Sequence, residues 1–522
     1  MKSTFYILFL FFLASNVCSQ ERLSGAQSDT LDPGEYIVEG DIWVESGILW
    51  YLRPGITLRF YDEVSFDIHG AFYAMGEEDD SIRFEAYDDQ SAWSGLDFQE
   101  THYTSYLNYC VIIGSNEEGV FIDFGGSAHL SHSRISNNSN RNGDVAGMRS
   151  RYGGLCSLTF TTISDNDGVG YFHEYGGASF DHCLIKGNNS GIIGGECATF
   201  FINNTVISEN MNSGLQIRNT AEAHVDSCKF VNNQAENGGG IVSNGAWIEI
   251  SRTLFFGNYA RNSGGAFFSE GEYLSNNLNN CVFTENQADS NGASIFTFSG
   301  FIVNSIFTGN GPSVNTFVSG DDFISYNSLY YGNESDIHFA EPDWVSEEFG
   351  IINTDNVNGD SCDQFYNLFM DPQFINPLDL NFHLRENSPC IDAGTSGIGW
   401  VDSLFDPDGG TTDIGIHYYH VSEVFEQKRN RSIPSQFSVK DIYPNPFNSS
   451  ITIRFGLQVD SEINLSVFNI IGQKVAQLYS GKHTAGYHTV VFNGDNLSSG
   501  IYFIHAKVPG KMDKVRKIVL VR

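Results

Sequence analysis

Residues 130–138 read LSHSRISNN, and the same unit returns as VDSCKFVNN at 225–233, ISRTLFFGN at 250–258 and IVNSIFTGN at 302–310. Each unit places an apolar residue before Ser, Thr or Cys, adds a second apolar residue and ends on Asn. This terminal residue recurs every 22–28 positions, at Asn138, Asn166, Asn188, Asn210, Asn233, Asn258, Asn286, Asn310 and Asn333. An earlier unit, LNYCVIIGS, carries Ser115 in the Asn position. A period of this length is typical of one turn of a solenoid.

The composition of each turn favours an all-β coil over a leucine-rich repeat. The leucine framework of that repeat is missing, whereas short alternating strands are separated by Gly and Asn. We therefore expect a parallel β-helix in which each strand pairs with the same strand one coil away, about 4.8 Å along the axis. Asn suits the corner because it tolerates the left-handed conformation, and stacked Asn side chains form an amide ladder.

The cysteines follow the same repeat. Cys110, Cys183, Cys228 and Cys281 share one position with Ser and Thr, and no two of them fall in adjacent coils. Cys183 and Cys228 would lie roughly 9–10 Å apart, which exceeds the reach of about 7 Å that a disulfide allows. These four are predicted to be buried free thiols. Outside the ladder, Cys362 and Cys390 are the favoured disulfide, and Cys156 and Cys197 stay unassigned.

The flanks of the repeat carry a resemblance to a known superfamily. GILWYLRPGITLRF at 47–60, FDIHGAFYAMG at 66–76 and WSGLDF at 93–98 resemble the opening coils of secreted bacterial right-handed β-helix proteins of the pectate-lyase-like superfamily. Residues 371–417 resemble the closing end of the same class. The resemblance covers about residues 30–420 and implies the fold. The resemblance does not indicate a particular activity, because that superfamily contains lyases, hydrolases, adhesins and inert scaffolds.

Both ends of the chain read as export signals. Lys2 precedes an apolar run at 5–14 that is too short to span a bilayer, and small residues follow it, so a signal peptide is expected to be cleaved before Gln20. Lipid attachment at Cys18 is the less favoured alternative, because residues 15–17 make a poor lipobox. At the other end, short alternating strands over about 80 residues predict a small immunoglobulin-like β-sandwich.

That C-terminal segment resembles the type A sorting domain of the type IX secretion system. The matching pieces are YPNPFN at 443, NIIGQKV at 469, AGYHTVVFNG at 485, LSSGIYFI at 497, and Lys514 with Lys517. The resemblance implies type IX machinery as a partner and delivery through the periplasm to the surface or beyond. The predicted boundaries are a signal peptide at 1–19, a cap with first coils at 20–106, central coils at 107–340, a closing end at 341–420, a linker at 421–440 and a sorting domain at 441–522.

The net charge of the chain changes sign at the predicted boundary between residues 420 and 421. Residues 20–420 carry 14 basic and 56 acidic side chains, a net charge of −42, whereas residues 421–522 carry 13 basic and 7 acidic ones, a net charge of +6. Such a field repels nucleic acid and anionic membranes, and it argues against a simple electrostatic trap for acidic polysaccharides. No later stretch is apolar enough to span a membrane. We expect the protein to be a monomer.

Aligning the strands that follow each Asn predicts two outward columns on one face. The first is Arg149, Gly170, Ile193, Gln216, Val242 and Phe267, and the second is Arg151, Phe172, Gly195, Arg218, Asn244 and Ser269. Three of the few arginines thus share a face with Phe172, His173, Glu174 and Gln216. Arginine clamps carboxylates and aromatic rings stack on sugars, so these seven residues (Arg149, Arg151, Phe172, His173, Glu174, Gln216 and Arg218) are the ligand-binding candidates. The alternative is that the arginines only balance nearby acids.

The remaining candidates are weaker. Asp406, Asp408 and Asp413 in DPDGGTTD suit a hard cation, so calcium is a possible cofactor, with a plain capping turn as the alternative. Asp165 and Asp167 lie near a corner and are candidates for the paired carboxylates of a glycoside hydrolase, but they are more typical of a solvated turn. The function these features favour is a secreted or cell-surface β-helix that binds carbohydrate or another extracellular partner. The alternatives are a lyase or glycoside hydrolase acting on uronate-containing polysaccharide, with an arginine as the base of β-elimination, and a structural adhesin.

Overall fold

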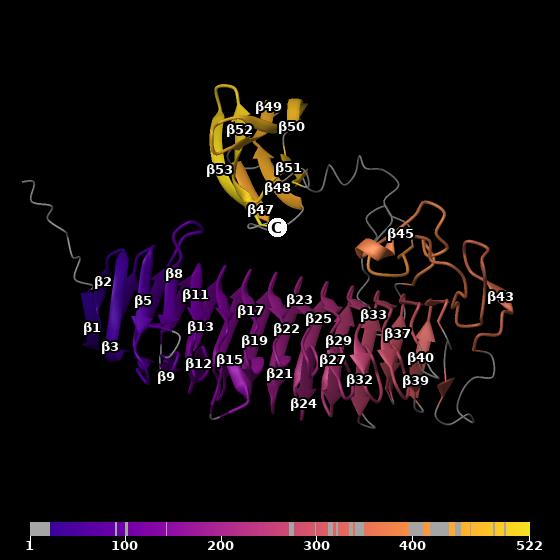
Figure 1. The fold of residues 1–522 in the computed structure, drawn as a ribbon. Helices are drawn as coiled ribbons and strands as arrows, with labels where there is room; N and C mark the ends of the chain where they lie inside the picture. The colour runs from indigo at the N-terminus through magenta and orange to yellow at the C-terminus, as the bar shows by residue number, and fades with distance from the viewer. Residues whose placement is uncertain are drawn as a thin grey trace, which may run out of the picture. The chain divides into compact units, whose positions relative to one another are not determined.

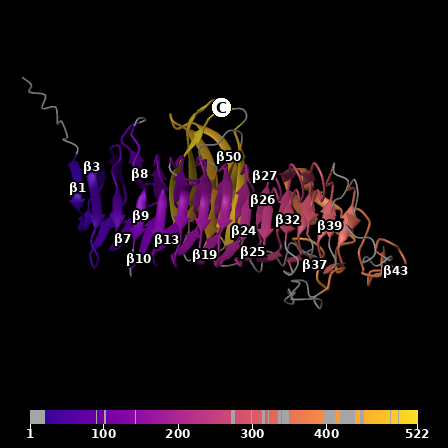
Figure 2. The same cartoon turned by 90° about the horizontal axis from the view of Figure 1, so that it is seen from below.

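A computed structural model describes residues 21–88, 91–99, 103–141, 143–270, 276–297, 299–311, 317–319, 322–333, 338–339, 349–395, 411–417, 438–443, 450–459, 461–483, 486–494 and 497–521. The predicted signal peptide and most of the predicted linker lie outside these residues. The chain divides into two compact units, residues 1–419 and 420–522. The first is a parallel β-helix whose rungs follow one another from β1 to β42 (Figures 1 and 2), which confirms the predicted fold.

Each coil contributes one strand to each of three parallel sheets. The first sheet has 13 strands: β2 (Asp29–Leu31), β4 (Leu49–Leu52), β7 (Ala71–Met75), β10 (Thr104–Asn108), β13 (Ser127–Ser131), β16 (Leu155–Thr159), β19 (Gly176–Asp181), β22 (Ala198–Asn203), β25 (Glu222–Asp226), β29 (Trp247–Ser251), β33 (Asn276–Asn279), β37 (Ser299–Val303) and β40 (Asp322–Tyr326). The other two sheets form one set of 26 strands, because the long strand β3 (Gly34–Val44) pairs with strands of both.

The second sheet contains β1 (Glu21–Ala26), β3 (Gly34–Val44), β5 (Ile56–Phe60), β8 (Ile82–Ala86), β11 (Cys110–Ile113), β14 (Arg134–Ser136), β17 (Thr162–Ser164), β20 (Leu184–Lys186), β23 (Val206–Ser208), β26 (Lys229–Val231), β30 (Leu254–Phe256), β34 (Val282–Thr284), β38 (Ile306–Thr308) and β41 (Leu329–Tyr331). The third sheet, which β3 also enters, contains β6 (Phe66–Ile68), β9 (Leu96–Gln99), β12 (Val120–Asp123), β15 (Val145–Ser150), β18 (Val169–His173), β21 (Ser190–Gly194), β24 (Leu215–Arg218), β28 (Ile241–Asn244), β32 (Phe267–Glu270), β36 (Ile295–Phe296), β39 (Phe317–Ser319) and β42 (His338–Phe339).

The predicted Asn ladder forms at the corner between the second and third sheets. Each buried Asn donates from Nδ2 to Oδ1 of the next one, as from Asn188 to Asn210 at 3.3 Å and from Asn210 to Asn233 at 2.9 Å. Each Oδ1 also accepts the backbone N–H of the preceding Asn. Ser115 completes the ladder by donating from Oγ to Asn138 Oδ1 at 3.0 Å, which confirms its assignment to the Asn position.

Close packing beside this ladder explains the glycines that open the third-sheet strands. A Cβ on Gly191 would lie 2.2 Å from the Gly214 carbonyl oxygen and 3.1 Å from Asn210 Nδ2. Since real Cβ atoms do not approach a carbonyl so closely, the corner requires Gly for the close approach of the next coil rather than for an unusual backbone angle.

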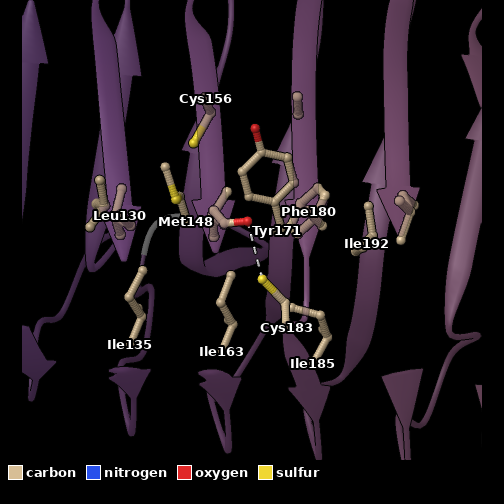
Figure 3. Packing of buried hydrophobic residues seen from close by; sticks show 14 of the residues in the cluster. Leu130, Ile135, Met148, Cys156, Ile163, Tyr171, Phe180, Cys183, Ile185 and Ile192 are labelled. Carbon is tan, nitrogen blue, oxygen red and sulfur yellow. Dashed lines mark hydrogen bonds between the residues drawn. The ribbon is translucent and has the colours of Figure 1, made fainter. Parts of the chain in front are cut away.

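The Ser/Thr/Cys positions form a second ladder at the corner between the first and second sheets. The Cys110 N–H donates to Ser133 Oγ at 3.0 Å, and the Cys228 N–H donates to Thr253 Oγ1 at 3.3 Å. All four ladder cysteines are free and buried, as predicted. Figure 3 shows Cys183 among the aliphatic side chains of the interior, where its thiol donates to the Leu158 carbonyl oxygen at 3.4 Å.

The predicted disulfide between Cys362 and Cys390 is wrong. Both residues are free thiols, as are Cys156 and Cys197. Cys362 and Cys390 instead act as buried apolar residues in a separate small core. Their position outside the ladder made a bridge plausible, but that small core has enough apolar surface of its own to use both side chains as fillers.

That small core closes the C-terminal end of the β-helix. The closing segment contains β43 (Thr354–Asp355), β44 (Ser361–Cys362), β45 (Phe374–Asn376), a 3-10 helix (Pro377–Asp379) and β46 (Asn381–Leu384). Its apolar side chains pack on the outward residues of the last four second-sheet strands, Leu254, Val282, Ile306 and Leu329. The closing segment therefore covers the second sheet in these coils.

The C-terminal unit is a small antiparallel β-sandwich, as predicted. One sheet contains β47 (Ser438–Tyr443), β48 (Ser450–Leu457) and β51 (Gly486–Asn493). The other contains β49 (Ser461–Asn469), β50 (Lys474–His483), β52 (Gly500–Val508) and β53 (Met512–Leu520). A core of its own, which includes Ile453, Leu465 and Ile504, lies between the two sheets.

Candidate functional site

The outward side of the third sheet carries the residues that the sequence singled out. Strand pairing aligns one outward residue from each coil into a single column: Trp43, Asp67, Asp97, Phe121, Arg149, Phe172, Ile193, Gln216, Val242, Phe268 and Phe296. Beside it run Asp123, Arg151, Arg218, Asn244 and Glu270. We call this surface the outer face.

Two parts of the predicted columns are wrong. Phe172 pairs with Arg149 rather than with Arg151, because the register of β15 and β18 differs by two residues from the predicted alignment, which leaves both side chains outward but places Phe172 in the other column. At the other end, Phe268 takes the outward position that was predicted for Phe267, while Phe267 and Ser269 point inward and are buried. The segment between Asn258 and β32 is one residue longer than the one between Asn233 and β28, and a slip of one residue reverses every side chain.

His173 is not on the outer face. Its ring is fully buried inside the coil, where Nδ1 lies 3.2 Å from the Tyr171 hydroxyl, and burial lowers its pKa to about 4. It is the one predicted ligand-binding residue that the alternation of β18 places inside. Glu174, the next residue, is half-buried, and its side chain occupies the space beside Gly195.

The two arginines of β15 are held by acids of the preceding coil. Arg149 Nε lies 2.9 Å from Glu118 Oε1, and its guanidinium carbon lies 5.6 Å from the Phe172 ring centre. Arg151 donates from Nε and Nη2 to Asp123 Oδ2 at 3.0 and 2.9 Å. The same guanidinium lies 4.9 Å from the centre of the Phe121 ring.

This pairing changes what the arginines can do. The hydrogen bond to Asp123 raises the pKa of Arg151 further above its usual range. A base for β-elimination needs the opposite shift, so Arg151 does not fit that role. The flat, charge-neutralised surface of arginine over aromatic rings suits stacking and hydrogen bonding to a ligand instead.

Three exposed aromatic residues continue this surface around the corner toward the first sheet. Phe124, Tyr152 and Tyr175 stack with ring centres 5.4 and 5.9 Å apart, and their exposed fractions are 59, 49 and 39%. Arg151 lies over Tyr152 as well, at 5.3 Å. We call these three residues the corner strip. They are missing from the sequence-based set because each falls in a turn, outside the strand positions used to build the columns.

Further along the outer face lies a polar pocket. Its floor comes from β24, β28 and β32, and its wall comes from the turn after the Asn corner, where β27 (Gln234–Ala235), β31 (Tyr259–Ala260) and β35 (Gln287–Ala288) form a short ridge. The lining residues are Asn212, Gln216, Ala235, Glu236, Asn237, Val242, Asn244, Phe268 and Glu270. Side-chain amides and carboxylates over a phenyl ring offer both donors and acceptors for hydroxyl groups.

Arg218 lies at the edge of this pocket and differs from the other two arginines. Its Nη2 donates to Gln216 Oε1 at 2.5 Å, and no carboxylate among the described residues pairs with it. The side chain is exposed. Of the three predicted arginines, Arg218 is thus the one whose charge a ligand carboxylate could meet.

The N-terminal part of the outer face holds an acidic group that the sequence reasoning missed. Asp67 and Asp97 are directly opposite each other in β6 and β9, and Asp123 lies in the next coil. Burial raises the pKa of Asp97 to about 6, and the negative charges of Asp67 and Asp123 add to the effect. The shared strand position of FDI at 66 and LDF at 96 could have found this pair.

The raised pKa of Asp97 makes stability depend on pH. Because the folded protein holds this proton more tightly than the unfolded chain, the ionised carboxylate destabilises the fold above about pH 6, and the penalty vanishes below the ordinary value of 3.8. We expect Asp97→Asn to raise the free energy of unfolding at pH 8 by at most about 3 kcal/mol and to leave it unchanged near pH 3.5. Urea denaturation at both pH values measures this. The exposed Asp165→Asn serves as the control, and equal gains at both pH values would contradict the assignment.

The remaining sequence candidates do not form a site among the described residues. Asp413 is buried, and its carboxylate accepts the Asp392 N–H at 2.8 Å. Asp406 and Asp408 lie outside the described residues, so calcium at this loop stays a prediction. Asp165 and Asp167 are exposed at the Asn corner. The described part of the chain holds no cluster of three or more His, Cys, Asp or Glu residues arranged to bind a metal ion.

Comparison with protein families matches both units. Residues 118–277 match the family described as right-handed beta helix region, and residues 441–521 match the secretion system C-terminal sorting domain. No curated protein matches the chain in sequence. Within the described residues, no helix is long and apolar enough to cross a membrane.

Several solved structures are similar to the chain at low identity. The A-module of the mannuronan C-5 epimerase AlgE4 of Azotobacter vinelandii is 12% identical over 58% of this chain and 87% of its own, with a TM-score of 0.27. The pectate lyase Pel9A is 12% identical over 77% and 97%, with a TM-score of 0.23. The tailspike protein of the E. coli bacteriophage HK620 is 9% identical over 92% and 86%, with a TM-score of 0.28.

The stacked parallel strands, the two internal ladders and the two family matches agree on one identity. The chain is a right-handed parallel β-helix protein that carries a type IX secretion sorting domain, and that system exports it to the cell surface or the surrounding medium.

Proposed function

We propose that this protein binds an extracellular polysaccharide along the outer face of its β-helix. The observation that carries the proposal is a column of outward side chains, mostly aromatic, arginine or amide and without a lysine, in which Ile193 and Val242 are the aliphatic members. It begins at Phe121, Arg149 and Phe172 and continues to Gln216 and the polar pocket. A linear polymer lying along the helix axis would meet one side chain of this column about every 4.8 Å, and most of these are planar or hydrogen-bonding.

The chemistry of the column fits a sugar. The rings of Phe121 and Phe172 carry guanidinium groups over them, which leaves amphipathic surfaces of the kind that sugar rings contact. In the pocket, the amides of Asn212, Gln216 and Asn244 can each donate and accept toward hydroxyl groups.

Binding is tested with the mature chain on a panel of soluble neutral and uronate-containing polysaccharides, followed by affinity electrophoresis. We expect Gln216→Ala and Arg218→Ala each to weaken binding about five- to tenfold, because each removes a hydrogen-bonding group from the pocket edge. Arg134→Ala on β14 of the second sheet is the matched control and should bind as the wild type does. Unchanged binding in the Gln216→Ala/Arg218→Ala double variant would refute the proposal.

A second candidate function is cleavage of the polysaccharide by the acidic group of the outer face. What favours it is the pairing of Asp67 with Asp97, because the raised pKa of Asp97, about 6, lets that carboxyl keep its proton in mildly acidic conditions, as a general acid beside a second carboxyl requires. The same panel, read for reducing ends and for the absorbance of unsaturated products, separates this function from simple binding. Turnover that Asp97→Asn abolishes would establish an enzyme, and no turnover on any polymer would leave binding alone.

A further inference from the structure

The outward side of the first sheet carries a second surface, separate from the outer face. Its centre lies over β16 and β19, where the outward side chains are short: Ser157 and Ser179 are directly opposite each other, and Gly177 lies beneath the exposed Leu155 side chain. No described residue forms a hydrogen bond with either serine hydroxyl. The floor of this surface thus offers two unused hydroxyl groups beside one apolar side chain.

Aromatic side chains border this floor along the helix axis. In the same outward column, Tyr106 and His129 precede Ser157 and stack with ring centres 5.3 Å apart and ring planes at 13°. After Ser179 come Phe201 and His224, stacked at 5.0 Å and 5°. Tyr106 and Phe201 have exposed fractions of 41 and 49%.

The two corners of the same coils are also aromatic. On one side lie Tyr152 and Tyr175 of the corner strip. On the other side Phe160 and His182 stack at 4.9 Å. Along the helix axis, the distance from His129 to Phe201 is three strand spacings, about 14 Å. Across the sheet, the length of β16 is about 13 Å. A floor of small residues is therefore bordered by rings on all four sides.

The charges at this surface select the class of ligand. None of the floor and border residues is a lysine or arginine, and the acids nearby are already engaged. His182 Nδ1 lies 3.0 Å from Asp181, and His224 lies between Glu222 and Glu249 at 2.9 and 3.1 Å. The cation at the border, Arg151 over Tyr152, is already paired with Asp123, so an acidic polymer would gain little from it and would face these carboxylates within a β-helix of net charge −42.

We infer that this first-sheet surface binds a neutral glycan, with sugar rings against the Tyr106 and Phe201 borders and sugar hydroxyls on Ser157 and Ser179. Rings and hydroxyls without an unpaired lysine or arginine match the faces and edges of an uncharged sugar. The floor spans several sugar rings, so an oligosaccharide rather than a monosaccharide is the expected ligand. This site is distinct from the polar pocket of the outer face, since it uses another sheet and none of the pocket residues, although Tyr152 and Tyr175 of the corner strip adjoin both surfaces.

The test is isothermal titration of the mature full-length chain with cellohexaose and mannohexaose, with a galacturonan hexamer as the acidic comparator. At least one neutral hexamer is expected to bind, and Tyr106→Ala and Phe201→Ala each to weaken it about five- to tenfold through loss of one stacking ring. Tyr366→Ala, an equally exposed ring on the closing segment, is the matched control and should change nothing. Circular dichroism checks that the outward substitutions leave the fold intact.

The outcomes separate this site from the proposed one. Neutral binding that survives in the Tyr106→Ala/Phe201→Ala double variant, or that is lost only in Gln216→Ala/Arg218→Ala, would overturn the inference. So would tighter binding of the galacturonan hexamer at this surface than of either neutral hexamer, or no binding of either neutral hexamer. Loss in the first-sheet variants with an intact outer-face response would support it even if the outer-face ligand proved different.

Discussion

Deletion of residues 441–522 is expected to leave a folded β-helix that stays in the periplasm. The deleted segment is the part that matches the secretion sorting domain, and it has a core of its own, separate from the core of residues 1–419. Because no strand of the β-helix pairs with a strand of the sandwich among the described residues, its removal breaks no sheet. Fractionation of cells followed by immunoblotting of periplasm, surface and medium measures the result, and we expect near-complete loss of surface and released protein.

The control for this deletion tests sufficiency. Residues 421–522 fused to an unrelated periplasmic protein should carry it to the surface, since the sorting signal lies in the tail. Exposed basic residues of β53, among them Lys514 and Lys517, stand on that tail. Protease resistance of the truncated β-helix in periplasmic extracts shows that it folds. Normal surface delivery of the truncated chain would contradict the assignment of the sorting function.

The fold was predictable because the residues that repeat are the residues that build the coil. Asn188 and Asn210 recur at one position since each must bond with the next, and Ser133 and Cys110 alternate since both fit the same crowded corner. Because the pattern recurs in every turn, the repeat can still be recognised where insertions after Asn138 and Asn258 lengthen a coil. Such redundancy identifies the architecture from sequence alone.

The site was less predictable because it depends on residues that occur once. A two-residue offset between β15 and β18 places Phe172 in another column, and one extra residue before β32 exchanges Phe267 for Phe268. His173 was expected on the outer face with its neighbours but lies inside, because it directly follows the outward Phe172 and alternation turns its side chain inward. The pair of Asp67 and Asp97 lies in the N-terminal coils, before the counted repeat begins, so the Asn period did not align it and only the similarity of FDI at 66 to LDF at 96 could have indicated it.

Asn210→Ala is expected to be among the most damaging single substitutions in the β-helix. The Asn210 side chain accepts from the backbone N–H and Nδ2 of Asn188 and donates to Asn233 Oδ1 and the Ile185 carbonyl oxygen, at 2.9–3.3 Å. The substitution leaves several buried groups without partners, each worth about 1–3 kcal/mol, so we expect a loss of about 4 kcal/mol. Urea denaturation followed by circular dichroism measures it.

Two other Asn residues provide the internal controls for this prediction, one outside the ladder and one at its end. Asn203→Ala on the outward side of β22 removes no side-chain hydrogen bond to a described residue and should cost less than about 0.5 kcal/mol. Asn333, the last Asn of the counted repeat, is half-buried whereas Asn210 is fully buried, so Asn333→Ala should cost less than Asn210→Ala. Because coils of a solenoid can open separately, hydrogen exchange should place the loss in the coils that contain Asn188, Asn210 and Asn233. Equal costs for Asn203→Ala and Asn210→Ala would mean that the ladder bonds merely replace bonds to water and that burial of the interior side chains alone holds the coil together.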